Sequence, residues 1–111
     1  MAHAEVATPR TEAEIAAQVV WVEFWRQAQR DPELRALHER IYDSWRSRIA
    51  GSVRAGVDAG AFRAVDADDW ARRFVALIDG LTLHVLLHPG SVTADDMERI
   101  AREQIAATLL P

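Results

Sequence analysis

The sequence contains neither cysteine nor lysine. Without cysteine, the chain can form no disulfide and no thiolate metal site. Its 13 basic residues are all arginine and are outnumbered by 17 acidic residues, so the formal net charge is -4. This mildly acidic balance argues against a nucleic-acid-binding surface, where clustered basic residues are expected. The missing lysine, beside abundant alanine, indicates the coding bias of a high-GC bacterial genome.

Long apolar runs and a secretory signal are missing as well. The longest apolar run, Leu81 to Leu87, is interrupted by His84 and is far shorter than the roughly 20 residues that a helix needs to cross a bilayer. The opening stretch "MAHAEVATPRTEAEI" has no apolar segment behind a basic start, as a secretory signal would have. We therefore expect a cytoplasmic protein without a membrane partner.

Catalytic motifs are also absent. The chain has no GxSxG, no HExxH and no glycine-rich phosphate loop, and no pair of carboxylates falls at a position expected to be buried. The acidic clusters near residues 66–69 and 95–96 are better explained as charges at helix starts, where the helix dipole favours them. We expect neither enzymatic activity nor a cofactor.

Proline, glycine and capping residues divide the chain into four expected helices. Asp31 before Pro32 is typical of a helix start, and Asp66 and Thr93 are further N-cap candidates. Gly60 marks the end of a helix. The expected helices cover residues 12–30, 32–59, 67–88 and 94–110. No segment alternates with period two, so no strand is expected and the predicted fold class is all-α.

The length is that of one domain, since 111 residues of which half are hydrophobic can form a single core. Residues 1–10 are expected to be a disordered leader. The domain itself is expected to span residues 11–111.

The third expected helix is apolar over an unusually large part of its circumference. At about 100° per residue, two adjacent apolar stripes run along it, and Asp79 belongs to the narrow polar remainder. A helix of this kind needs cover from more than one side. The other three helices or a second copy of the chain can supply that cover. We favour a second copy, because large homodimer interfaces resemble a core cut in half, and Gly80 would let a crossing helix come close.

Aromatic residues gather on the first two expected helices. Trp21, Phe24 and Trp25 form an arc that can face Tyr42 and Trp45. Such a box suits a flat apolar ligand or a quaternary ammonium held by cation–π contacts. The alternative is that these rings simply fill the core.

Two histidines, His84 and His88, lie four residues apart, a spacing compatible with a shared metal. A metal site would need a third ligand such as His38, and no carboxylate stands suitably beside the pair. We therefore predict no metal site. We expect His84 to be packed and hydrogen-bonded near a pocket or interface, and His88 to lie at a helix C-terminus. We expect His38 to be a core histidine with its polar atoms satisfied; the alternative is a polar group of a pocket.

The order of several short motifs resembles a known family. An "EFW" helix is followed by "DPELR" opening a long helix, by "YDSW", by "GVDAGAFRAVDADDWA" between helices and by "ALIDGL". From Val20 to about Leu109 the chain resembles the C-terminal domain of TetR-family transcriptional repressors, in the branch of choline- and betaine-responsive regulators. The resemblance implies an all-helical domain that binds a small effector among its helices. It also implies dimerisation through the last two helices, as a four-helix bundle with a second chain.

The resemblance places two groups of residues. The ligand-binding residues that it implies are Trp21, Phe24, Trp25, His38, Ile41, Tyr42, Trp45, Phe74, Leu77, Leu81 and His84. The dimer-interface residues that it implies are Val75, Ile78, Gly80, Thr82, Leu83, Leu86, Leu87, Met97, Ile100, Ala101, Gln104, Ile105 and Thr108. The implied partners are a second copy and a small apolar, aromatic or cationic effector.

One feature of the family is not matched. Family members begin with a helix-turn-helix domain that enters the major groove, and no such pattern precedes the first matching helix here. We therefore expect no operator binding by this chain, whether it is a fragment or a stand-alone domain. The leading hypothesis is an effector-binding and dimerisation domain. Its rivals are a structural helical dimer without a ligand and a metal-binding or catalytic bundle built on the histidines.

Overall fold

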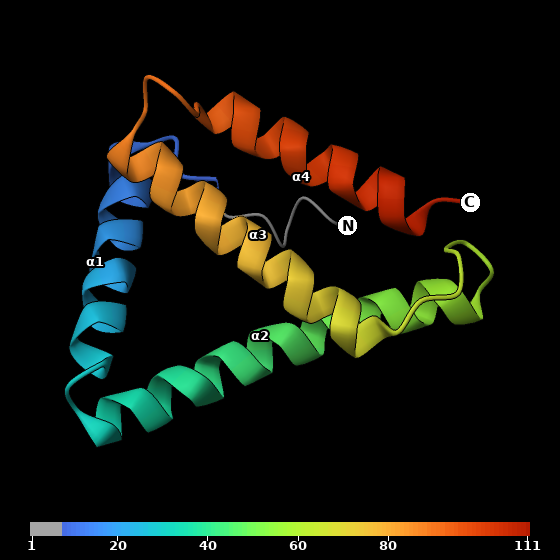
Figure 1. The fold of residues 1–111 in the computed structure, drawn as a ribbon, viewed down its shortest axis with the longest axis horizontal. Coiled ribbons are helices and arrows are strands. Elements are labelled where there is room, and N and C mark those ends of the chain that lie inside the picture. The colour runs from blue at the N-terminus through green and yellow to red at the C-terminus, as the bar shows by residue number, and fades with distance from the viewer. Residues whose placement is uncertain (1–7) are drawn as a thin grey trace.

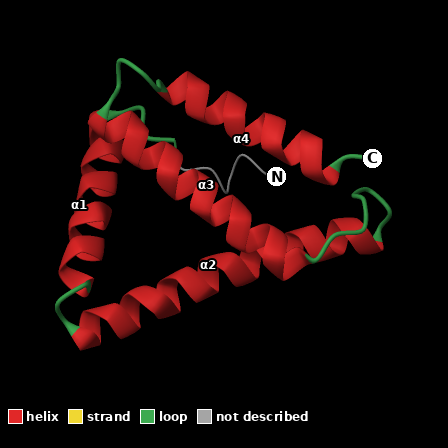
Figure 2. Ribbon diagram, in the orientation of Figure 1, coloured by secondary structure: helices red, strands yellow, loops and turns green. Residues whose placement is uncertain are grey.

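Four α-helices make up the fold. A computed structural model describes residues 8–111, in which α1 spans Glu12–Ala28, α2 Pro32–Asp58, α3 Ala67–Leu87 and α4 Ala94–Leu109 (Figure 1). The part of the chain that the structure describes contains no strand (Figure 2). The all-α prediction is therefore confirmed. Each helix begins where the sequence predicts and ends one or two residues earlier.

The expected leader lies mostly outside the described residues, which exclude residues 1–7. Its last part, residues 8–10, is described and lies against the rest of the fold, with Pro9 buried.

Side-chain caps fix the helix starts. Asp31 accepts hydrogen bonds from the backbone N–H groups of Glu33 and Leu34, and Pro32 occupies the first helical turn. Asp66 caps α3 in the same way, and Thr93 forms a capping box with the third residue of α4. These bonds satisfy amide groups that have no partner inside the helix. A further capping box, between Thr11 and Glu14 at the start of α1, was not identified from the sequence.

The turn between α2 and α3 depends on two glycines. Gly60 ends the helix with a positive φ of 76°, a conformation that costs glycine little because it has no Cβ. Gly56 lies directly beneath the ring of Phe62, and a Cβ at this position would collide with that ring. Gly56 therefore allows the loop that follows α2 to pack closely against this helix.

The four helices form a thin, open arrangement. In Figure 1, α1, α2 and α3 form three sides of a triangle, while α4 runs beside α3 on the outside. The shortest principal dimension is 19 Å, about two helix diameters. A chain this thin cannot surround α3 completely.

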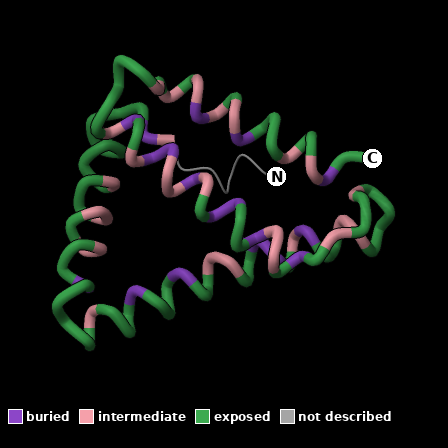
Figure 3. Tube along the Cα trace, viewed as in Figure 1, coloured by how far each residue is buried: buried purple, intermediate pink, exposed green. Residues whose placement is uncertain are grey.

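The core is centred on α3. Buried positions lie on the sides of α2, α3 and α4 that face one another, whereas most of α1 is exposed (Figure 3). Eight α3 residues are buried, namely Ala67, Ala71, Phe74, Val75, Ile78, Leu81, Thr82 and Val85. Because α1, α2 and α4 all pack against α3, much of the cover that this helix needs comes from its own chain.

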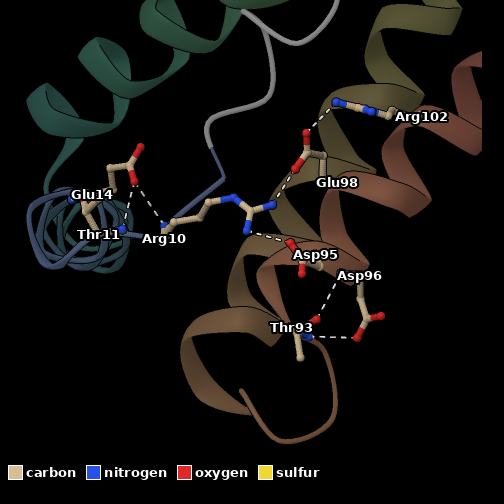
Figure 4. Close-up of polar contacts among 8 residues, drawn as sticks. All are labelled: Arg10, Thr11, Glu14, Thr93, Asp95, Asp96, Glu98 and Arg102. Atoms are coloured by element: carbon tan, nitrogen blue, oxygen red, sulfur yellow. Dashed lines mark hydrogen bonds and ion pairs between the residues drawn. The ribbon is translucent and has the colours of Figure 1, made fainter.

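Polar bonds fasten α4 at both ends. At its start, the guanidinium of Arg10 forms ion pairs with Asp95 and Glu98 (Figure 4). At its end, the backbone and side chain of Arg63 donate to the carbonyls of Leu109 and Leu110. The segment before α1 and the loop before α3 are thus both tied to α4.

None of the described helices is long and apolar enough to cross a membrane.

Candidate functional site

A cavity of about 410 Å³ opens between α1, α2 and α3. This volume lies within the range of about 300–1,000 Å³ that is usual for small-molecule pockets. Its lining residues are Gln18, Trp21, Val22 and Trp25 from α1, Ile41, Trp45 and Arg48 from α2, and Ile78, Asp79, Thr82 and Leu83 from α3. The helix α4 contributes none of them.

The lining residues follow the helical repeat. Those of α1 are spaced i, i+3, i+4 and i+7, and those of α2 are spaced i, i+4 and i+7, so each set occupies one face of its helix. Each helix therefore presents one continuous stripe to the cavity.

The aromatic residues of α1 and α2 form one connected cluster. His38 lies at its centre, stacked on Trp21 with ring centroids 5.1 Å apart and an interplanar angle of 16°. The next ring along α2, that of Tyr42, lies 4.7 Å from His38 and 5.8 Å from Trp45. The ring of Trp25 also stacks on that of His38, with the two ring centroids 6.2 Å apart. The cluster thus forms an aromatic wall that joins two helices.

Three rings of the cluster, those of Phe24, His38 and Tyr42, do not face the cavity. Phe24 meets Trp21 edge-on at 5.4 Å and does not line the cavity, and neither does His38 or Tyr42. The rings that face the cavity are therefore those of the tryptophans at positions 21, 25 and 45.

The buried His38 has an unsatisfied ring nitrogen. Only 8% of the residue is exposed, and Nε2 has no hydrogen-bond partner among the described residues. The prediction of a satisfied core histidine is therefore only half right, since the side chain is buried but one nitrogen is unpaired. Burial lowers the pKa of His38, although the charges of Asp79 and Glu39 oppose this, and so favours the neutral ring.

Among the residues that the structure describes, Asp79 is the only carboxylate that lines the cavity. Its Oδ2 accepts a 2.5 Å hydrogen bond from the hydroxyl of Tyr42, a short bond of the kind that ionised acceptors form. Burial raises the pKa of Asp79, although the bond from Tyr42 opposes this rise. Burial and the neighbouring carboxylate likewise raise the pKa of Tyr42, so the phenol remains a donor.

The charge of Asp79 is not neutralised by an ion pair within residues 8–111. Arg46, whose charge lowers the pKa of Asp79, forms its ion pair with Asp43 at 2.6 Å and lies over the Tyr42 ring at 5.6 Å from its centroid. The cavity therefore combines three indole rings with one carboxylate and the guanidinium of Arg48, and within the described residues the carboxylate forms no ion pair.

Comparison with known proteins identifies the family. A family model described as "BetI-type transcriptional repressor, C-terminal" matches residues 1–110. The chain belongs to the BetI-type repressor C-terminal family. The resemblance to TetR-type regulators predicted from the sequence motifs is thereby confirmed.

Two relatives of this BetI-type domain are regulators. The HTH-type transcriptional regulator PksA of Bacillus subtilis (strain 168) is 30% identical over 98 residues, which make up 87% of this chain and 46% of PksA. The crystal structure of a candidate transcriptional regulator from Saccharomonospora viridis in complex with choline matches with a TM-score of 0.86 and 32% identity, over 96% of this chain and 55% of that one. The chain therefore spans about half the length of both relatives.

Asp79 was missed as a site residue in the sequence analysis of this BetI-type domain. The helical projection assigned it to the polar side of the third helix, facing water. One signal was available, because Asp79 is the only acidic residue between Arg73 and Asp95. An isolated carboxylate in an otherwise apolar helix is a candidate functional group.

Three residues expected at the ligand lie elsewhere in α3. Phe74 and Leu77 line a smaller groove of about 190 Å³ between α3 and α4, together with Trp70, Gln104 and Thr108. Leu81 is buried in the core. In their place Ile78, Thr82 and Leu83, which were expected at a dimer interface, line the cavity. The face that α3 turns toward α1 and α2 is thus the stripe adjacent to the expected one.

Of the two histidines at the end of α3, His84 differs from expectation, whereas His88 lies at the helix C-terminus as expected. His84 is exposed rather than packed, and His88 caps the helix, its backbone N–H donating to the carbonyl of His84. Their rings lie 6.1 Å apart. No group of three potential metal ligands occurs in the described part of the chain, and His38 belongs to the aromatic cluster instead.

The residues expected at the dimer interface fall into two groups. Val75, Met97 and Ala101 are at most 3% exposed, because the chain's own α3 and α4 bury them against each other, so they are not available to a second chain. The remaining interface residues of these helices are at least partly exposed, namely Gly80, Leu86, Leu87, Ile100, Gln104, Ile105 and Thr108. No described element approaches Gly80, where an added Cβ would meet no atom within 4 Å.

Proposed function

We propose that this domain senses a small organic cation bearing a quaternary ammonium group, which binds in the cavity between α1, α2 and α3. The observation that carries the proposal is the presence of Asp79 on a wall that holds three tryptophan rings and several aliphatic side chains, together with the polar side chains of Gln18, Arg48 and Thr82. The relative from Saccharomonospora viridis in complex with choline supports the same class of ligand.

The chemistry of a quaternary ammonium explains why this lining suits it. The group carries a positive charge but has no N–H, so it cannot be recognised by hydrogen-bond acceptors in the usual way. Aromatic faces attract it through their quadrupole, by about 0.5–2 kcal/mol for each contact. A carboxylate adds a Coulombic attraction of about 4 kcal/mol at 4 Å when the effective dielectric constant is about 20.

The structural rival, a dimer with a filled core, is disfavoured by the same observations. A filled core would bring Trp21, Trp25 and Trp45 into contact with α3 and exclude solvent, yet a cavity of about 410 Å³ separates these elements. A carboxylate without an ion pair would also be a costly choice for a purely structural wall, because a partly desolvated charge needs compensation.

The test compares choline with its neutral isostere, 3,3-dimethylbutanol, by isothermal titration calorimetry. We expect choline to bind at least about tenfold more tightly, which corresponds to about 1.4 kcal/mol. Asp79→Asn is expected to remove this preference while leaving the weak binding of the isostere unchanged. The matched control is Asp68→Asn, which changes the net charge equally in the first turn of the same helix, where Asp68 is exposed and paired with Arg54.

Two results would contradict the proposal. One is equal binding of choline and the neutral isostere by the wild-type domain. The other is the same loss of choline affinity in both Asn variants, which would indicate a general effect of net charge rather than contact with Asp79.

We also propose that the domain dimerises through the outer faces of α3 and α4. The groove between these helices supports this proposal, and so does Leu87, which is 66% exposed. Membership of the family supports it as well. Sedimentation velocity at micromolar concentration tests it. Gln104→Arg, at the groove, is expected to weaken the dimer, whereas Glu103→Arg, on the charged side of α4 where Glu103 pairs with Arg99, is not. A monomeric wild-type chain would refute the proposal.

A further inference from the structure

His38 is a buried titratable group that the proposed function does not use. Its side chain does not line the cavity, and its ring lies among those of Trp21, Phe24 and Tyr42, at centroid distances of 5.1, 5.3 and 4.7 Å. Its Nε2 has no hydrogen-bond partner within residues 8–111. A buried nitrogen without a partner costs free energy, so an apolar ring would pack at this position at lower cost.

The surroundings of His38 can accommodate a positive charge on its ring. An aromatic face within about 6 Å attracts a cation, and the stacked ring of Trp21 meets this condition. Burial lowers the pKa of His38, whereas the charges of Asp79 and Glu39 raise it. The aromatic ring and the carboxylates therefore offset part of the cost of desolvating an imidazolium.

The charged groups that act on His38 come from two of the helices packed around it. Asp79 belongs to α3 and is partly buried, whereas Glu39 of α2 is exposed, where solvent screens its charge. The side of α1 that faces His38 is aromatic, and the charged Glu23 and Arg26 of that helix pair with each other at 2.6 Å on its exposed side. Asp79 is thus the carboxylate that connects His38 with the cavity.

His38 and the cavity share their neighbours. The rings of Trp21 and Trp25 stack on His38 and also line the cavity. Tyr42 joins His38 to the cavity carboxylate, with its ring centroid 4.7 Å from that of His38 and its hydroxyl 2.5 Å from Oδ2 of Asp79. Against the effect of burial, the charge of Asp79 raises the pKa of His38, and the charge of His38 lowers the pKa of Asp79. A positive charge on His38 therefore acts on the same carboxylate and the same indole rings as a cation in the cavity.

We propose that His38 makes the cavity sensitive to pH, because a protonated His38 competes with the cationic effector for the negative charge of Asp79 and for the tryptophan rings. This inference rests on the proposed function and adds regulation to it. A proton on His38 and a cation in the cavity weaken each other's binding by the same factor, since coupling between two sites is reciprocal. The domain therefore binds its effector more weakly in mildly acidic solution, where a histidine takes up a proton.

The first experiment measures the affinity for choline by isothermal titration calorimetry between about pH 8 and about pH 5. We expect the affinity of the wild-type domain to fall by about tenfold or more over this range. His38→Phe keeps an aromatic ring in the cluster but cannot take up a proton, so its affinity should fall by about threefold or less, whatever its value at the higher pH.

His84→Phe is the matched control. It removes an imidazole from an exposed position of α3, outside the cavity, and should retain the full loss of affinity seen in the wild-type domain.

A second measurement uses the wild-type domain and so does not depend on the folding of His38→Phe. Proton NMR follows the titration of the His38 ring, identified by its contacts with Trp21. Saturating choline should lower the pKa of His38 by about one unit, the reciprocal of a tenfold loss of affinity. Asp79→Asn should lower the pKa of His38 in the free domain, because it removes a charge that raises this pKa. A histidine with a purely structural role would show the same pKa with and without choline.

The outcomes separate this inference from the proposed function. The inference is overturned if the affinity for choline falls equally in the wild-type domain and His38→Phe, or if choline leaves the pKa of His38 unchanged. Either result, together with choline binding that depends on Asp79, leaves the proposed function standing. If choline does not bind at any pH, both proposals fail.

Discussion

Removing the hydroxyl of Tyr42 tests whether Asp79 supplies the negative charge of the cavity. In Tyr42→Phe the carboxylate loses the 2.5 Å bond that it accepts from the phenol. A buried hydrogen bond to a charged group contributes about 1.5–3 kcal/mol. Because Asp79 keeps some contact with solvent, we expect a loss at or just below the lower end of this range, about 1–1.5 kcal/mol of unfolding free energy at neutral pH.

The pH dependence of this loss has a definite sign. Burial holds the pKa of Asp79 in the folded state above its usual value, and the bond from Tyr42 opposes burial. An acid whose pKa is raised on folding contributes stability that is present at pH below its unfolded pKa and is lost as the pH rises through the folded pKa. Tyr42→Phe raises the folded pKa of Asp79 further. Its destabilisation is therefore smallest in acid, where Asp79 is protonated, and largest at neutral pH.

Urea denaturation followed by tryptophan fluorescence, between about pH 4 and about pH 8, measures this dependence. Choline titrations over the same range should show binding begin at higher pH in Tyr42→Phe, since a cation needs the ionised carboxylate. The matched background is Asp79→Asn, in which Tyr42→Phe should show little dependence on pH. A destabilisation that is independent of pH, or that has the same pH profile in the Asp79→Asn background, would refute the reasoning.

Three further substitutions test the packing of the domain. Gly56→Ala should destabilise it by about 1–3 kcal/mol in urea denaturation, because the new Cβ collides with the ring of Phe62. The control is Gly51→Ala, in open space on the same helix, which should stabilise the domain by up to about 1 kcal/mol. Equal effects of the two substitutions would contradict this interpretation of α2. Met97→Ala should cost about 2–5 kcal/mol in the same assay, since Met97 is 0% exposed, and a cost below about 1 kcal/mol would mean that α4 is not held by this side chain. Arg10→Gln should leave the unfolding midpoint nearly unchanged, because its ion pairs are exposed. Amide hydrogen exchange in the first turn of α1 should nevertheless become faster. Unchanged exchange would show that these ion pairs do not hold the start of α1 in place.

The helix boundaries were predictable because their causes are local. Asp31, Asp66 and Thr93 each cap a helix through bonds to amides two or three residues ahead, so the sequence contains both partners within one turn. The ends were less accurate because the last turn depends on where the chain must go next. The positive φ of Gly60 marks one such end, and its residue type was a sufficient signal.

The cap of α1 was overlooked for a different reason. Thr11 and Glu14 have the spacing of a capping box, but they directly follow a segment that was expected to be disordered. The ion pairs that hold Arg10 join residues separated by more than eighty positions. No local pattern predicts such a contact, so the order of residues 8–10 was not visible in the sequence.

The rotation of α3 about its axis was the least predictable feature of the fold. An amphipathic helix has one apolar face, and this face determines which side packs inward. In α3, both stripes are apolar, so hydrophobicity alone does not distinguish the face toward α1 and α2 from the face toward α4. Successive residues differ by about 100°, and choosing the wrong stripe exchanged the roles of Leu77 and Ile78, of which the structure places the first at the groove and the second at the cavity.

The polar residues of α3 resolve this ambiguity better than its apolar ones. A water-facing acid on a helix is normally accompanied by other polar residues on the same side, as Asp69 is by Arg73, its ion-pair partner. Asp79 has no polar neighbour one turn later on the same side of α3, because Leu83 is apolar and lines the same cavity. A carboxylate between apolar neighbours must find a donor or a cation to offset its desolvation. Tyr42 supplies the donor, which leaves the remaining capacity of Asp79 directed at whatever occupies the cavity.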